Sequence, residues 1–104
     1  MKRSRYISVP LNEQGIKDYN YGEESNNIKV FNIDETQFST MEELGVFDKI
    51  NNRCQLLIDD YESEEIKGSN LEIALNITKN TNCELLTTAL ELAIKYNTLV
   101  GLDF

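Results

Sequence analysis

The chain contains no histidine and no tryptophan, and it has only one proline and two cysteines in 104 residues. Histidine is the commonest general base and a common metal ligand, so its absence removes the usual centre of acid–base and zinc chemistry. Cys54 and Cys83 lie 29 positions apart and form no C-x-x-C pair. This spacing does not support a zinc site and predicts two buried, reduced thiols. We therefore expect no metal and no cofactor.

Positive charge and long apolar runs are also scarce. The chain has 10 basic and 18 acidic residues, a net charge of −8, and from Tyr6 onward the count is 7 against 18. Nucleic acid and anionic membranes need a cationic face, so the composition argues against both as ligands. No apolar run approaches the ~20 residues that span a bilayer. A signal peptide has an apolar stretch after its basic start, and the basic residues at the start of this sequence are not followed by one. A cytoplasmic protein is expected.

The length and the 40% hydrophobic content predict a single domain over residues 1–104 with one core. Apolar residues alternate with polar ones in three segments, and a fourth is apolar almost throughout, which predicts strands over 5–10, 28–33, 54–58 and 99–104. The segment 11–27, rich in Asn, Gly and Glu, is expected to form a loop.

Three helices are predicted from a repeated capping signature, a hydroxyl residue followed three positions later by glutamate. The pairs are Ser39 with Glu42, Ser69 with Glu72, and Thr81 with Glu84. Each pair opens an apolar-periodic segment, so helices are expected over about 39–51, 71–79 and 83–96. These elements predict an α+β fold, a small and mostly antiparallel sheet with about three helices packed on one face.

The strongest local feature is a run of five carboxylates within seven residues, behind the apolar stretch 56–58. They are Asp59, Asp60, Glu62, Glu64 and Glu65. The run is compatible with a metal site, with a solvated acidic turn, or with a docking surface for a basic partner. Like charges at such spacing repel, at a cost that accumulates to a few kcal/mol at low salt. Solubility alone would be served as well by spreading these charges over the surface, which counts against the solvated turn without removing it as an alternative.

A metal-dependent hydrolase is the catalytic alternative. Glu65 and Lys67 match the E-x-K pattern of metal-dependent nucleases, with Asp59 or Asp60 as a further ligand. Two features count against it: the first acid of that pattern normally lies further upstream, and the acidic body offers no cationic track for a nucleic-acid substrate. We therefore expect that the chain is not an enzyme.

Tyrosines interleaved with acids favour the docking surface. Tyr61 lies inside the acidic run, and a second segment places Tyr19 and Tyr21 beside Glu23 and Glu24. Rigid amphipathic tyrosines commonly act as interface anchors, while acids steer a basic partner. The predicted partner-binding residues are thus Asp59, Asp60, Tyr61, Glu62, Glu64, Glu65, Tyr19, Tyr21, Glu23 and Glu24.

In its segment "LLIDDYESEEIK" (56–67) and the capped helices on either side, the chain resembles bacterial immunity proteins, particularly those paired with toxins of contact-dependent growth inhibition. The resemblance is one of size, acidity and composition. It implies a small protein that binds and occludes a basic toxin domain, often a nuclease, by charge complementarity. A phage-encoded inhibitor that mimics nucleic acid with the same carboxylates remains an alternative.

Overall fold

The protein is built around a four-stranded antiparallel sheet with the strand order β2-β1-β4-β3. The computed structural model describes residues 4–104. Along the chain the elements are β1 (Arg5–Pro10), α1 (Glu13–Asn20), β2 (Ile28–Ile33), α2 (Glu35–Glu43), α3 (Val46–Cys54), β3 (Ser63–Lys67), α4 (Asn70–Asn80), α5 (Glu84–Tyr96) and β4 (Leu99–Asp103). The α+β class and the antiparallel sheet expected from the sequence are confirmed.

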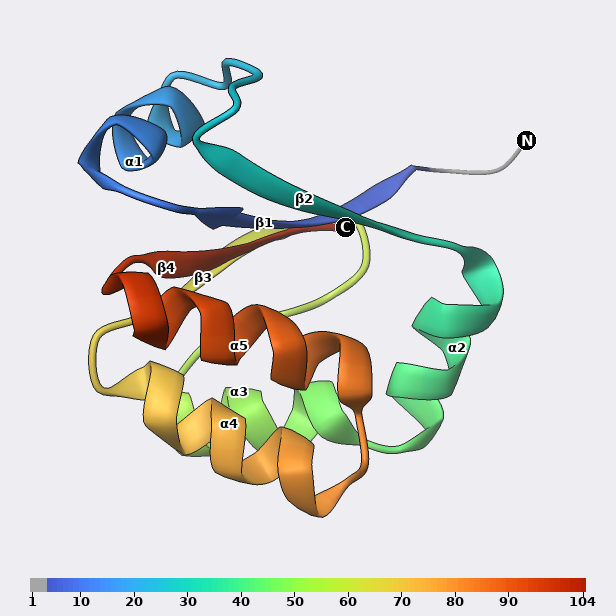
Figure 1. Cartoon of the computed structure of the whole chain (residues 1–104). Coiled ribbons are helices and arrows are strands. Elements are labelled where there is room, and N and C mark those ends of the chain that lie inside the picture. The colour runs from blue at the N-terminus through green and yellow to red at the C-terminus, as the bar shows by residue number, and fades with distance from the viewer. Residues whose placement is uncertain (1–3) are drawn as a thin grey trace.

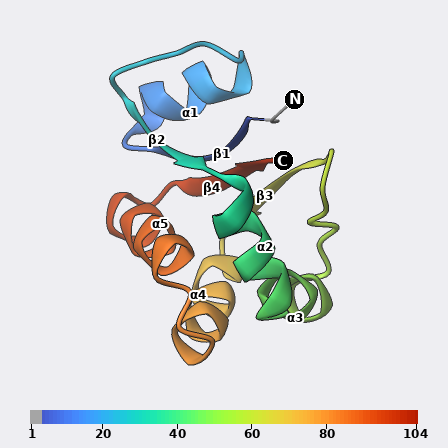
Figure 2. The same cartoon turned by 90° about the vertical axis from the view of Figure 1, so that its right-hand side faces the viewer.

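Helices cover the two faces of the sheet unequally (Figure 1). Helices α3, α4 and α5 lie on one face with α2 at their side, whereas α1 alone lies on the opposite face (Figure 2). The core fills the space between the sheet and the larger helical layer, where Ile7, Val100, Leu102, Leu86 and Leu90 are fully buried. The expected layer of about three helices corresponds to α3–α5, and the helix on the other face was not predicted.

The strand register assigns side chains to the outer face of the sheet, which is the face that carries α1. Residues paired directly across antiparallel strands point to the same side. Two rows therefore share this face, and they are Asn32–Tyr6–Asp103–Ser63 and Val30–Ser8–Gly101–Glu65. Side chains of four strands that are distant in the sequence meet on this outer face.

The segment 11–27, expected to be a loop, contains the helix α1. Its N-cap is Asn12, whose side chain accepts a hydrogen bond from the Gly15 N–H at 2.8 Å. The helix has few apolar residues, chiefly Ile16 and Tyr19, so it lacks the repeated apolar spacing by which a helix is recognised in a sequence. It forms because one short apolar side is sufficient to pack against the sheet.

The single helix expected over 39–51 is divided into α2 and α3. Asp34, rather than Ser39, begins the first of them: its side chain accepts from the Gln37 N–H, and the Gln37 side chain accepts from the Asp34 N–H, a complete capping box. The division falls at Gly45, whose φ of 71° lies in the left-handed region that glycine adopts without strain.

The prediction of a strand over residues 54–58 is wrong. Helix α3 continues to Cys54, and the residues 55–62 form no helix or strand. The strand in this region is instead β3, which includes Glu64 and Glu65 of the acidic run and contributes only Ile66 to the core. An edge strand with one buried side chain does not need an apolar sequence. Conversely, the apolar stretch that suggested a strand is not buried throughout, since Leu57 is 80% exposed.

The two later helices occur where they were predicted, but their expected caps do not form. Neither Ser69 nor Cys83, the N-caps of α4 and α5, makes a side-chain capping bond. The Thr81 hydroxyl instead donates to the Ile77 carbonyl at 2.9 Å, closing the end of α4. Apolar periodicity therefore identified these helices correctly, and the capping signature did not.

Candidate functional site

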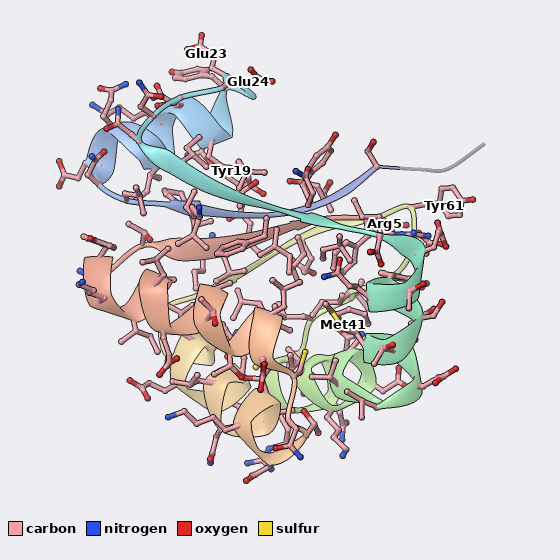
Figure 3. The ribbon with its side chains drawn as sticks, turned by 45° about the vertical axis from the view of Figure 1, so that its right-hand side comes forward. Arg5, Tyr19, Glu23, Glu24, Met41 and Tyr61 are labelled. Atoms are coloured by element: carbon pink, nitrogen blue, oxygen red, sulfur yellow. The ribbon has the colours of Figure 1, made fainter. Side chains whose placement is uncertain are left out.

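An open hollow of about 1090 Å³ lies on the outer face of the sheet, beside α1 and the segment that follows it. Four carboxylates line it, those of Glu23, Glu24, Glu65 and Asp103, together with Tyr6 and Tyr19. We call this region the acidic hollow. None of the lining residues, all within the described chain, is a lysine or arginine. Figure 3 shows Glu23 and Glu24 above the sheet, and Tyr19 between α1 and the strands.

The acidic hollow exists because α1 is held close to the sheet at two glycines. A β-carbon at Gly15 would lie 2.2 Å from the Asn27 carbonyl oxygen, and one at Gly101 would lie 2.1 Å from the Tyr19 hydroxyl oxygen. Both distances are far below contact, so only glycine permits these approaches. One wall of the hollow is thus fixed by the absence of side chains at two positions.

Tyr19 has a largely structural role. Its ring lies over Gly101 of β4, and its hydroxyl lies near the Asp103 carboxylate. Burial raises the pKa of Tyr19 well above its ordinary value, and the negative charges of Asp103 and Glu65 raise this pKa further. The sequence predicted Tyr19 as a partner anchor, and the structure places it as the side chain that joins α1 to the sheet.

The raised pKa of Tyr19 predicts a loss of stability at alkaline pH. Below pH ~10 the phenol is neutral in the folded and unfolded states alike. Above that pH the unfolded chain loses the proton while the folded chain keeps it, so the free energy of unfolding falls as pH rises. Urea denaturation from pH 7 to ~11 should show a smaller fall in Tyr19→Phe than in the wild type. Equal slopes would mean that Tyr19 does not contribute to this fall.

The segment after α1 is ordered by Asp18. Its pKa is lowered by hydrogen bonds, first from Ser25 and then from Gln14, so the ionised form is stabilised. Its carbonyl also accepts from the Glu23 N–H at 2.9 Å. This turn leaves Tyr21 80% exposed, next to the glutamates of the hollow. Tyr21 is therefore exposed, and its predicted role in binding a partner stays a prediction.

The acidic run is divided by the fold, and its members have different environments. Asp60 faces Arg5, which donates to it from Nε at 3.2 Å and from Nη2 at 3.1 Å. The Glu64 carboxylate accepts from the backbone N–H groups of Leu57 and Glu65. Asp60 and Glu64 are thus engaged in stabilising the fold.

The remaining members of the run face two different directions. Glu65 enters the acidic hollow, with the Lys67 ammonium 3.5 Å from its carboxylate. Asp59, Tyr61 and Glu62 are exposed in the turn before β3, outside the residues that line the hollow. Of the ten predicted partner-binding residues, the structure thus brings Tyr19, Glu23, Glu24 and Glu65 together around one surface.

Among the residues of the hollow that were not predicted as site residues, Asp103 and Tyr6 matter most for its charge and contact area. Asp103 ends β4, and Tyr6 lies opposite it on β1. Both were recognised only as members of alternating strands. Their position beside Glu65 depends on the pairing of β4 with both β1 and β3, which no local pattern specifies.

The pattern of Glu65 and Lys67 does bring the two side chains together on the outer face, but Asp60 is held by the buried Arg5 on the other side of the sheet. Within residues 4–104, no group of three or more acidic, cysteine or histidine side chains is placed to hold a metal ion. Cys54 and Cys83 are both buried and unpaired with each other, and burial raises the pKa of each thiol.

Comparison with known proteins finds no matching family model, no matching curated protein and no matching solved structure. No helix found among residues 4–104 has both the length and the apolar character to cross a membrane.

Proposed function

We propose that this chain is an inhibitor of the immunity-protein type, which binds a basic toxin domain, in particular a nuclease domain, and occludes it without chemistry. The acidic hollow is the primary contact surface in this proposal. The observation that carries it is the convergence of Glu23, Glu24, Glu65 and Asp103, from three separate segments, on one open surface.

Charge supports a basic protein as the partner. The chain has a net charge of −8, and four of its carboxylates surround a hollow without a lining cation. Such a concentration of one sign attracts an oppositely charged partner and raises its association rate by roughly 10 to 10³-fold. Nuclease domains carry the cationic surfaces that phosphates require, so they are suitable partners by the same argument.

Apolar and aromatic side chains at the hollow supply contact area in addition to charge. Tyr6 is 38% exposed and Val30 is 46% exposed, and both line the hollow, with Tyr21 close by. Interfaces combine buried anchors of this kind with a charged rim. A surface with both features is better suited to a protein than to a small ion.

Reversal of charge at Glu23 and Glu24 is expected to weaken binding. The test uses the purified C-terminal domain encoded by the gene directly upstream, because immunity genes follow their toxin genes. Stopped-flow mixing should show at least about 10-fold slower association for Glu23→Lys/Glu24→Lys, and this association rate should depend less on salt. Calorimetric titration should show the corresponding weaker affinity.

The matched control is Glu42→Lys/Glu43→Lys, an adjacent exposed pair at the end of α2 with the same change in net charge. If both double variants slow association equally, the whole-molecule charge acts and the acidic hollow is not the contact surface. If the wild type neither binds nor inhibits the upstream domain, the proposed function is wrong.

A further inference from the structure

The segment 55–62, which joins α3 to β3 along one side of the molecule, is fixed by side chains (Figure 2). The Asn51 carboxamide on α3 makes two bonds to the backbone of Ile58: its oxygen accepts from the N–H at 2.7 Å, and its nitrogen donates to the carbonyl at 2.9 Å. The Ile58 side chain is buried at 5% exposure. Both backbone groups of this residue are thus satisfied, as they would be within a sheet.

Two further contacts hold the segment on either side of Ile58. The Leu57 N–H donates to the Glu64 carboxylate of β3 at 3.1 Å. Asp60 accepts two bonds from Arg5 of β1. Because these contacts come from α3, β3 and β1, the conformation of the segment is set by the fold before any partner binds.

This fixed segment turns two large side chains outward. Leu57 is 80% exposed and Tyr61 is 76% exposed, and the φ of Tyr61 is 69°, in the left-handed region that costs a non-glycine residue about 1–2 kcal/mol. Figure 3 shows Tyr61 at the side of the molecule, distant from Glu23 and Glu24. Apolar side chains presented on a preordered backbone bind with little loss of conformational entropy.

We propose that residues 55–62 form an insertion loop, in which Leu57 enters an apolar pocket of a basic partner protein with Tyr61 beside it. Asp59 and Glu62, both exposed in the same loop, then meet cationic groups at the rim of that pocket. The inference rests on the proposed function and adds to it a second contact surface, where apolar burial supplies affinity and charge supplies selectivity for a cationic partner.

The binding test compares Leu57→Ala with Leu44→Ala, a substitution at a second exposed leucine located at the end of α2. Both positions are exposed, so both variants are expected to unfold at the wild-type temperature. Titration with the C-terminal domain encoded directly upstream should give a Kd at least about 30-fold weaker for Leu57→Ala, with unchanged salt dependence. The Leu44→Ala variant should bind like the wild type.

A second measurement needs no partner. Amide hydrogen exchange of the free protein should show the Ile58 N–H protected in the wild type and exchanging at least about 10-fold faster in Asn51→Ala. Exchange of Ile58 at the rate of an unstructured peptide would overturn the preordered loop. Wild-type affinity in Leu57→Ala would overturn the insertion and leave the proposed function standing, whereas no binding by the wild type would overturn both.

Discussion

Replacement of Arg5 by methionine is expected to lower the free energy of unfolding by about 3 kcal/mol, a shift of roughly 12–24 °C in Tm. The Arg5 side chain is 5% exposed and bridges two carboxylates, with Nη1 2.6 Å from Glu35 and the Nε and Nη2 atoms bonded to Asp60. Its guanidinium also lies 4.0 Å from the centre of the Phe38 ring. Hydrogen bonding to Asp60 is the largest cause that raises the pKa of Arg5.

The large effect follows from what the substitution leaves behind. Without the guanidinium, Asp60 and Glu35 lose their shared partner and repel each other, and Asp60 is only 29% exposed at its side chain. The loss of one member of a buried ion pair is more damaging than the loss of the whole group. The triple variant Arg5→Met/Glu35→Gln/Asp60→Asn should therefore recover part of the lost stability.

Chemical denaturation measures these differences, with Arg53→Met as the control because Arg53 is exposed at the end of α3. That control should change the free energy of unfolding by less than ~0.5 kcal/mol. An equally small change in Arg5→Met would show that the three charged groups do not stabilise the fold.

Substitution of Gly15 by alanine is expected to destabilise the protein by about 2 kcal/mol, although the same change within an ordinary helix stabilises by about 0.5–1 kcal/mol. The new β-carbon would lie 2.2 Å from the Asn27 carbonyl oxygen, which belongs to the backbone and also accepts from the Leu11 N–H at 2.8 Å. The backbone at Asn27 cannot move without loss of that bond. Helix α1 must therefore shift away from its position.

The readout is local as well as global. Amide exchange within α1 should rise strongly in Gly15→Ala, while the amides of α5 should follow only the change in overall stability. The exposed substitution Lys17→Ala on the same helix is the control. Because α1 forms a wall of the acidic hollow, Gly15→Ala should also weaken partner binding. A stabilised Gly15→Ala would contradict the close approach of α1.

The fold was predictable where local periodicity decides the structure. The segments 5–10 and 28–33 alternate in the sequence and form β1 and β2, and the apolar spacing in α4 and α5 gave their positions. These elements need only a repeated apolar side to find the core. The predictions for the segments 11–27 and 54–67 were wrong. In the first segment, helix α1 has too few apolar residues to be recognised. In the second, the apolar Leu57 faces solvent and an acidic sequence forms β3.

The candidate site was predictable only in its chemistry. The acids and tyrosines of both segments were recognised, but their partners inside the molecule were not. Asp60 is bonded to Arg5, which is 55 positions away, and Tyr19 lies over Gly101, still further along the chain. Contacts between residues so far apart in the sequence depend on which strands pair. Local composition does not reveal this pairing. Leu57 was predicted to lie in an apolar strand over 54–58, but it faces solvent in a segment without helix or strand.

The sequence by itself determined the acidity of this protein, the lack of histidine chemistry and the antiparallel α+β class, because these depend on composition and on short-range periodicity. Tertiary structure alone decided which acids stabilise the fold and which face solvent. The physical reason is the register of β1, β4 and β3, which brings Glu65 and Asp103 to one face and leaves Asp60 on the other with a buried arginine.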